Sequence, residues 1–201
     1  MSDLISSGCD KILGISIGLV IPENTSWLWV ENLYRGINNA LNIYGGSIIG
    51  GDCSSGSKKL ISITAIGEQS NLISRRFFCK PGHKILTTGP HGLSKVGLLL
   101  KTNAFFNQSK FLSAKLIDES IKAFCKPSPQ KELIGGIFRL KPKSCEPHIG
   151  CTDTSDGLFQ SLLDLSNESK CKAIVDYSKI PKHIDWPNGK IWDEYYFYGG
   201  E

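Results

Sequence analysis

The chain has 201 residues, of which 40% are hydrophobic, and its 23 basic and 19 acidic residues leave a formal net charge of +4. No run of lysine or arginine exceeds two residues, which argues against a nucleic-acid-binding surface. Seven cysteines without a C-x-x-C pair argue against a disulfide framework and a structural zinc site, and favour a cytoplasmic protein.

The first third of the chain is typical of an α/β unit. Residues 1–11 predict a short helix. Residues 12–21 form an apolar run that stops at a proline; a membrane span needs about twenty residues, so this run predicts a buried strand. Residues 25–46 predict a helix that ends at two glycines, and 47–52 and 59–68 predict two further strands. The predicted helix carries one apolar face, made of Trp29, Leu33, Ile37 and Leu41.

A break in this pattern falls at residues 74–83, where Pro81 and Gly82 indicate a turn. We therefore predict a domain boundary that divides the chain into residues 1–78 and 79–201. The elements predicted beyond it are strands over 84–89 and 172–181, helices over 92–101, 113–125 and 155–169, and a loop over 141–150.

The last residues, 193–201, are an aromatic segment that runs into a Gly-Gly turn. Apolar segments usually lead into further structure, so we expect the chain to be a fragment of a longer protein.

Three acidic turns stand out as candidate sites. Asp52 follows an apolar strand in "IIGGDCSSG", Asp153 and Asp156 lie in "TDTSDGL" before a predicted helix, and Glu201 ends "YGGE". Carboxylates without paired histidines or thiolates suit Mg²⁺, and a helix N-terminus suits a phosphate. An Asp-Gly turn is more often only a turn, however, and Asp156 can simply stabilise the start of a helix.

Two other candidates are less suitable. The segment "GDCSSGSKK" resembles a phosphate-binding loop, but Ser57 stands where that loop requires lysine and a strand is predicted to follow, so we exclude it. The four histidines have no metal or triad spacing, and we interpret them as surface or turn residues.

Five motifs in order resemble thiamine-monophosphate kinase, a member of the aminoimidazole-ribonucleotide synthetase-like superfamily: "SDL", "GGDCSSG" followed by "ISITAIGE", "RRFFCKPGHKILTTG", "TDTSDGL" and "YGGE". The resemblance implies a two-domain α/β fold with ATP bound between the domains. Residues 1–78 would be an incomplete N-terminal domain that binds ATP and Mg²⁺ and forms a homodimer through its strands. Residues 79–201 would be an incomplete C-terminal α/β domain.

The resemblance also implies an activity and the residues that support it. The activity is transfer of the γ-phosphate of ATP to thiamine monophosphate, which needs Mg²⁺ but no strong general base. Glu201 corresponds to a residue on the thiamine side. The implied ATP-binding residues are Gly51, Asp52, Arg76 and Ser155, and the implied metal ligands are Asp3, Asp52, Asp153 and Asp156.

Departures from the family pattern keep two alternatives open. Family members carry an Asp-Asp-Ala-rich strand before "SDL" and a tail after "GGE", so the resemblance implies a fragment that lacks both termini. The first alternative is a truncated, inactive remnant that binds nucleotide. The second is another ATP-using member such as selenophosphate synthetase, although Cys9 does not lie in the glycine-rich N-terminal setting of its reactive residue.

Overall fold

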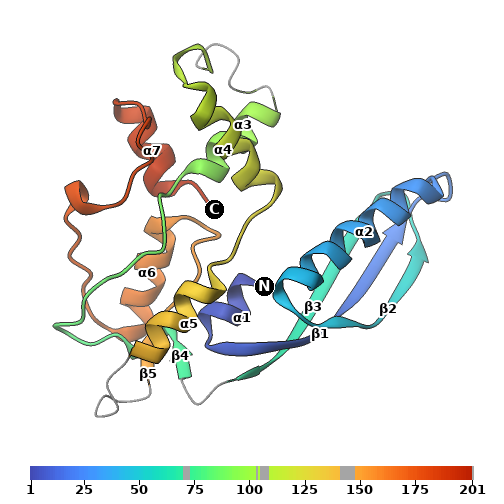
Figure 1. The fold of residues 1–201 in the computed structure, drawn as a ribbon, viewed down its shortest axis with the longest axis horizontal. Coiled ribbons are helices and arrows are strands. Elements are labelled where there is room, and N and C mark those ends of the chain that lie inside the picture. The colour runs from blue at the N-terminus through green and yellow to red at the C-terminus, as the bar shows by residue number, and fades with distance from the viewer. Residues whose placement is uncertain (70–72, 103, 105–108, 141–147, 201) are drawn as a thin grey trace.

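The computed structural model describes residues 1–69, 73–102, 104, 109–140 and 148–200 (Figure 1). An elongated sheet with one long helix lies at one end of the molecule, and a group of shorter helices lies at the other (Figure 1). The short elements between or around these parts are α1 (Ser2–Ser6), η2 (Ser109–Phe111), α5 (Lys131–Leu140) and η3 (Tyr177–Lys179).

The sheet has β1 (Cys9–Ile21) at its centre, with β2 (Ser47–Ser55) on one side and β3 (Leu60–Gln69) on the other. β2 runs parallel to β1, and β3 runs antiparallel to it. A parallel pair needs a crossover connection, and α2 (Trp27–Tyr44) provides it while lying along the sheet (Figure 1). The three predicted strands and the predicted helix are confirmed, and β2 extends three residues beyond the predicted end.

Local signals define both ends of α2. The Ser26 hydroxyl accepts a hydrogen bond from the Trp29 N–H at 3.3 Å, and Gly45 follows the helix with a φ of 91°. The predicted apolar face of this helix packs against β1, where Ile15, Ile17 and Leu41 form a buried cluster.

The helix α2 covers the strands of the sheet unequally. Ile17 and Ile63 are cross-strand partners on β1 and β3, but Ile17 is 1% exposed and Ile63 is 50% exposed. The helix therefore buries the central strand and leaves the β3 edge largely open in the single chain.

A second core lies among α3 (Leu93–Lys101), α4 (Ala114–Cys125) and α7 (Lys190–Tyr198). The first two helices approach closely, because Gly97 of α3 lies against the backbone carbonyl of Ser120. The buried residues of this core are Val96, Leu112, Leu116, Trp186, Trp192 and Tyr196.

The remaining elements join the two parts. β4 (Ile73–Arg75) pairs in parallel with β5 (His148–Gly150), and η1 (Arg76–Phe78) follows β4 directly. α6 (Leu158–Ser169), which lies within the helix predicted over 155–169, packs against η1 and buries Leu158 and Leu162. The predicted loop over 141–150 is wrong at 148–150, which is β5, and its residues 141–147 lie outside the described part.

Two predicted strands are wrong. Residues 84–89 form irregular backbone, with Ile85 51% and Leu86 74% exposed. A strand needs a hydrogen-bonded neighbour, and none of the described strands pairs with this segment. In 172–181, the Asp176 carboxylate accepts the Ser178 N–H at 3.1 Å, a local bond that competes with strand pairing and begins a 3₁₀ turn.

The aromatic C-terminal segment is helical up to Tyr198. Its Trp192 and Tyr196 are four residues apart, so both lie on one helix face and enter the second core. The predicted Gly-Gly turn follows at Gly199 and Gly200.

The surface interpretation of the histidines is correct for His83 but wrong for His91 and His183, which are 1% and 7% exposed. His183 is buried because both ring nitrogens have partners: Nδ1 accepts the Asp185 N–H at 3.0 Å, and Nε2 lies 3.0 Å from a Glu119 carboxylate oxygen.

In the sequence, the residues of one buried cluster precede residue 78 and those of the other follow residue 79. The domain boundary between residues 78 and 79 stays a prediction. Among the described helices, none is long and apolar enough to cross a lipid bilayer.

Candidate functional site

A cavity of about 280 Å³ opens where α1, η1 and the segment after β5 meet. It gathers three of the predicted site residues, Asp3, Arg76 and Asp153, which are far apart in the sequence. The residues lining it are Asp3, Ser6, Ser7, Arg75, Arg76, Phe77, Cys151, Thr152, Asp153 and Glu168. The mixture of two arginines with three carboxylates suits a ligand that carries negative charge and a counter-ion.

Asp153 is held on both its side chain and its backbone. The Ser2 hydroxyl donates to its Oδ2 at 2.8 Å, which ties α1 to the "TDTSDGL" turn. The Ser161 hydroxyl donates to its carbonyl oxygen at 2.8 Å from the first turns of α6. The turn is therefore anchored from two directions and presents a carboxylate to the cavity.

Arg76 is held on its side chain. Its Nε donates to the Thr152 hydroxyl oxygen at 3.2 Å, and its Nη1 lies 3.1 Å from Oδ2 of Asp164 on α6. The neighbouring Arg75 donates to the carbonyl oxygen of Ser7 at 3.2 Å, at the end of α1. Arg75 thus connects β4 with the end of α1, and Arg76 connects η1 with α6 and with the segment after β5.

Ser155 and Asp156 are exposed and lie beside this cavity's lining segment rather than in it. The "TSDG" turn lies against the end of α7, because Gly200 contacts the Ser155 carbonyl and Gly157 contacts the backbone of Tyr198. The structure therefore brings two of the acidic motifs together. Glu201 itself lies outside the described residues. Asp156 lies two residues before α6, whose N-cap is Gly157, and its stabilising effect on the start of this helix stays a prediction.

Asp52 and Gly51 lie on β2 and are not among the residues lining the cavity. Asp52 is exposed and accepts a hydrogen bond from the Ser54 hydroxyl at 3.1 Å. Gly51 lies so close to the backbone of Ile17 that a side chain cannot fit, which gives this glycine a structural reason independent of any ligand.

The predicted metal ligands are only partly assembled. Asp3 and Asp153 share the cavity, whereas Asp52 and Asp156 do not line it. Within the part of the chain that the structure describes, no group of three or more histidine, cysteine, aspartate or glutamate side chains could hold a metal ion. The donor set seen in this single chain therefore falls short of the four-ligand site that the resemblance implies.

Cys151 also lines the cavity. Burial raises the pKa of its thiol. A thiol with a raised pKa stays protonated at neutral pH and is a poor nucleophile. The cavity is therefore equipped for binding anions rather than for covalent catalysis by cysteine.

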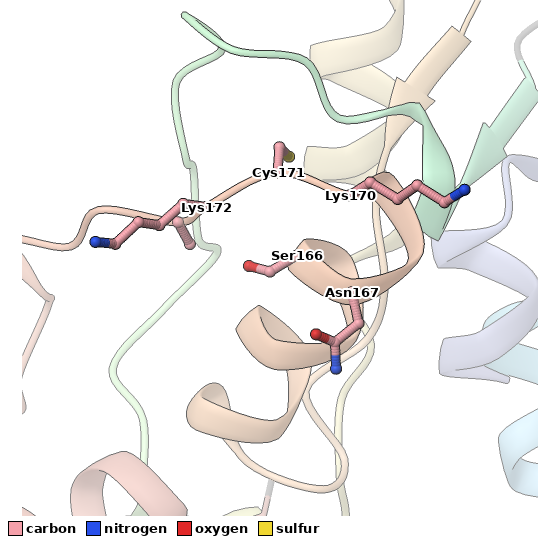
Figure 2. A pocket seen from close by; sticks show the side chains of 6 residues that line it. Ser166, Asn167, Lys170, Cys171 and Lys172 are labelled. Atoms are coloured by element: carbon pink, nitrogen blue, oxygen red, sulfur yellow. The ribbon is translucent and has the colours of Figure 1, made fainter.

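A larger hollow, of about 540 Å³, lies at the C-terminal end of α6 (Figure 2). It is shallow, and its two basic side chains, Lys170 and Lys172, point away from each other (Figure 2). None of the predicted site residues lines it. Its size therefore does not make it the better candidate site.

Sequence reasoning did not identify Arg75, Thr152 and Glu168, which line the cavity, or Asp164, which pairs with Arg76. The "RR" pair and the "TDTSDGL" motif could have indicated the first two. Asp164 and Glu168 lie on the polar side of an ordinary amphipathic helix, so nothing in the local pattern distinguishes them.

Comparisons with known proteins place this geometry in context. Residues 1–69 match the family model described as AIR synthase related protein, N-terminal domain. The thiamine-monophosphate kinase of Prochlorococcus marinus is 40% identical over 201 residues, which cover 100% of this chain and 60% of that protein. The enzyme of the same name from Escherichia coli K12 is 29% identical over 199 residues, covering 96% and 57%. The chain spans 60% of the length of the first two curated relatives.

Solved structures show the same fold. The thiamine monophosphate kinase of Aquifex aeolicus superposes with a TM-score of 0.79 at 24% identity, covering 100% of this chain and 65% of that one. AaThiL complexed with AMPPCP and TMP gives 0.80 at 24% identity, covering 100% and 62%. The hydrogenase maturation protein HypE gives 0.72 at 18% identity, covering 92% and 54%. The predicted aminoimidazole-ribonucleotide synthetase-like fold is thereby confirmed.

Proposed function

Because the chain belongs by sequence to the thiamine-monophosphate kinase family, we propose that it takes part in phosphorylating thiamine monophosphate to thiamine diphosphate, with ATP as donor and Mg²⁺ as metal. The observation that carries the proposal is the cavity that gathers Asp3, Arg76 and Asp153. A relative with the same fold has been solved with AMPPCP and TMP, an ATP analogue among its ligands.

The residues of the cavity suit this chemistry. Both reactants carry phosphates, so the main barrier is to bring two anions together and to stabilise the charge that spreads during transfer. The guanidinium of Arg76 offers a planar cation with several N–H donors. The acceptor is already an anionic phosphate, so no strong general base is needed, and the described cavity contains no histidine.

Mg²⁺ would neutralise phosphate charge when bound. Asp3 and Asp153 are the carboxylates in the cavity that we propose as its ligands, with Asp52 and Asp156 as the further predicted ones. Because these four are not brought together in the described chain, we assign no step to the metal. Ser155 and Gly51 as nucleotide contacts, and Glu201 as a thiamine-side residue, belong to the same proposal.

The assembly and location of the protein are also proposals. A homodimer formed through the sheet is supported by the exposed apolar side chains along β3, such as Ile61 at 42% and Ile63 at 50%. A cytoplasmic location is supported by its cysteines, of which the six in the described residues are free thiols.

One observation favours the second candidate, a remnant that binds nucleotide without turnover. Among the described residues, no group of three or more histidine, cysteine, aspartate or glutamate side chains could hold a metal ion, while the arginines that would contact an anion are in place. A chain with the anion contacts but an incomplete metal site would bind a nucleotide and transfer nothing.

A transfer assay with the 201-residue protein separates the two candidates. The protein is incubated with Mg²⁺, ATP labelled on its γ-phosphate and thiamine monophosphate, and thiamine replaces thiamine monophosphate in a parallel reaction. We expect labelled thiamine diphosphate only with the monophosphate. Arg76→Ala should lower the rate about 10- to 100-fold, the equivalent of a lost charge-assisted hydrogen bond.

Arg35→Ala is the matched control, because Arg35 forms a similar exposed pair with Glu31 at 3.0 Å within α2. Its rate should equal that of the unchanged protein. Nucleotide binding without transfer would favour the remnant. If the protein neither binds nucleotide nor transfers phosphate, both candidates are contradicted.

A further inference from the structure

The side-chain contacts of Arg76 go beyond a single ion pair. Its Nε bonds to Thr152 and its Nη1 pairs with Asp164, so the guanidinium is held from two sides. These two bonds engage only two of the five N–H groups that a guanidinium carries. The others can reach a ligand, and Arg76 lines the cavity.

Asp164 is itself fixed. Its second carboxylate oxygen, Oδ1, accepts a hydrogen bond from the Gln160 amide at 2.7 Å, one turn earlier on α6. Its carboxylate is therefore oriented before it meets the arginine. Asp164 is not among the residues that line the cavity, and its contact with the lining runs through Arg76.

The same helix also holds the backbone of the arginine segment. The Ser169 hydroxyl donates to the Arg76 carbonyl at 2.6 Å and accepts the Cys79 N–H at 3.0 Å. The three-residue turn η1 is thus clamped at its start and at its end by the last turn of α6. These bonds fix the backbone of η1, from which the Arg76 side chain extends.

We propose that Asp164 is a positioning residue, which together with Thr152 orients the Arg76 guanidinium toward an anionic group of the nucleotide in the cavity. The orientation toward a nucleotide rests on the proposed function. A purely stabilising ion pair is a weaker explanation, because the side chains are 48% and 26% exposed and surface pairs contribute little to stability. An arginine held in advance loses less side-chain freedom when its ligand arrives.

The first test does not depend on any ligand. Exchange of the Arg76 Nε–H with water is measured by nitrogen-15 NMR in the unchanged protein and in Asp164→Ala. We expect exchange about tenfold faster in the variant, because a charge-assisted bond that restrains the side chain is lost. Asp164→Asn retains an acceptor and should give an intermediate rate. An unchanged rate in Asp164→Ala would overturn the proposal.

Glu31→Gln is the matched control for this measurement, since it removes the carboxylate from the Arg35 pair on α2. It should change the Arg35 signal and leave that of Arg76 as it was. A change at Arg76 in the control would show that the readout reports general loosening of the protein and would contradict the assignment.

The second test is a double-mutant cycle on the binding of a non-hydrolysable ATP analogue with Mg²⁺. Asp164→Ala should weaken binding about tenfold when Arg76 is present and have no effect in Arg76→Ala. Equal weakening in both backgrounds would overturn the positioning role. Tighter binding when Arg76 is present would show that Asp164 competes with the ligand, which also overturns it.

The two tests separate the two proposals. If the unchanged protein binds no nucleotide while Asp164→Ala still accelerates the exchange at Arg76, the nucleotide function fails and Asp164 still orients the arginine. If nucleotide binds and Asp164→Ala leaves both the exchange and the affinity unchanged, the proposed function stands and the positioning role fails.

Discussion

The sheet region, residues 9–69, and the helical region, residues 91–198, cover their apolar side chains differently. In the sheet region one helix lies over a central strand, so Ile17 is buried and its partner Ile63 on β3 is half exposed. In the helical region three helices and a loop enclose Leu116 and Tyr196, both of which are 0% exposed. In these two regions the apolar pattern identified β1 and α4, but it did not predict how completely their neighbours cover them.

The largest expected effect compares the two partners in the sheet. Ile17→Ala should lower the free energy of unfolding by about 2–5 kcal/mol, because it leaves a cavity beneath α2, whereas Ile63→Ala should cost less than about 1 kcal/mol. Urea denaturation at low protein concentration measures both. A large loss from Ile63→Ala that disappears on dilution would mean that a second copy covers the β3 edge.

Replacing a helical glycine by alanine should change the stability of the protein in opposite directions in the two regions. Gly97→Ala places a methyl group against the Ser120 carbonyl and should cost about 1–3 kcal/mol, because α3 and α4 must move apart. Gly36→Ala in the exposed middle of α2 meets no atom within 4 Å and should stabilise by about 0.5–1 kcal/mol. Thermal unfolding of both variants checks the prediction, and equal signs would contradict it.

The helical region also has a pH-dependent link. The Tyr177 hydroxyl donates to Asp193 at 2.5 Å, and this bond lowers the pKa of the Asp193 carboxyl. Burial, and then the bond to Asp193, raise the pKa of Tyr177. The Asp193 contribution is present above its unfolded pKa of about 3.9 and is lost as the pH falls through the lowered folded value. The Tyr177 contribution is complete below about pH 10 and is lost as the pH rises through the raised folded value.

Tyr177→Phe should therefore cost about 0.5–1 kcal/mol at neutral pH, a small value because both side chains are partly exposed. The difference from the unchanged protein should shrink as the pH falls below the unfolded pKa of about 3.9 and through the lowered folded pKa of Asp193. Urea unfolding at several pH values measures the difference. A cost that stays constant as the pH falls through this range would show that the bond to the carboxylate is not its source.

The smallest expected effect lies at the end of α6. Lys170 has a φ of 52°, a left-handed conformation that glycine adopts without strain. Lys170→Gly should therefore raise stability by up to about 1 kcal/mol, or leave it unchanged if the greater freedom of the unfolded glycine offsets the gain. Lys172→Gly is the control, since its backbone is not left-handed, and it should stabilise nothing. A loss in Lys170→Gly larger than in the control would contradict the prediction.

The candidate site illustrates the limit of sequence reasoning. Asp3, Arg76 and Asp153 were named through the family resemblance, and they share a cavity, although their roles stay predictions. Asp164 could not be found, because its significance depends on a contact across 88 residues of sequence with Arg76. The same limit explains the false strand at 84–89, where an apolar run has no partner among the described strands.

By itself the sequence determined β1, α2, β3 and the helix α6, because the spacing of apolar side chains indicates which face of an element avoids water. The tertiary structure decided the rest: burial of His183, the helical form of the aromatic segment before Gly199, and the clamp of Arg76 by α6. These features depend on residues distant in sequence that supply hydrogen bonds or cover a surface. Such partners become definite only when the chain is folded.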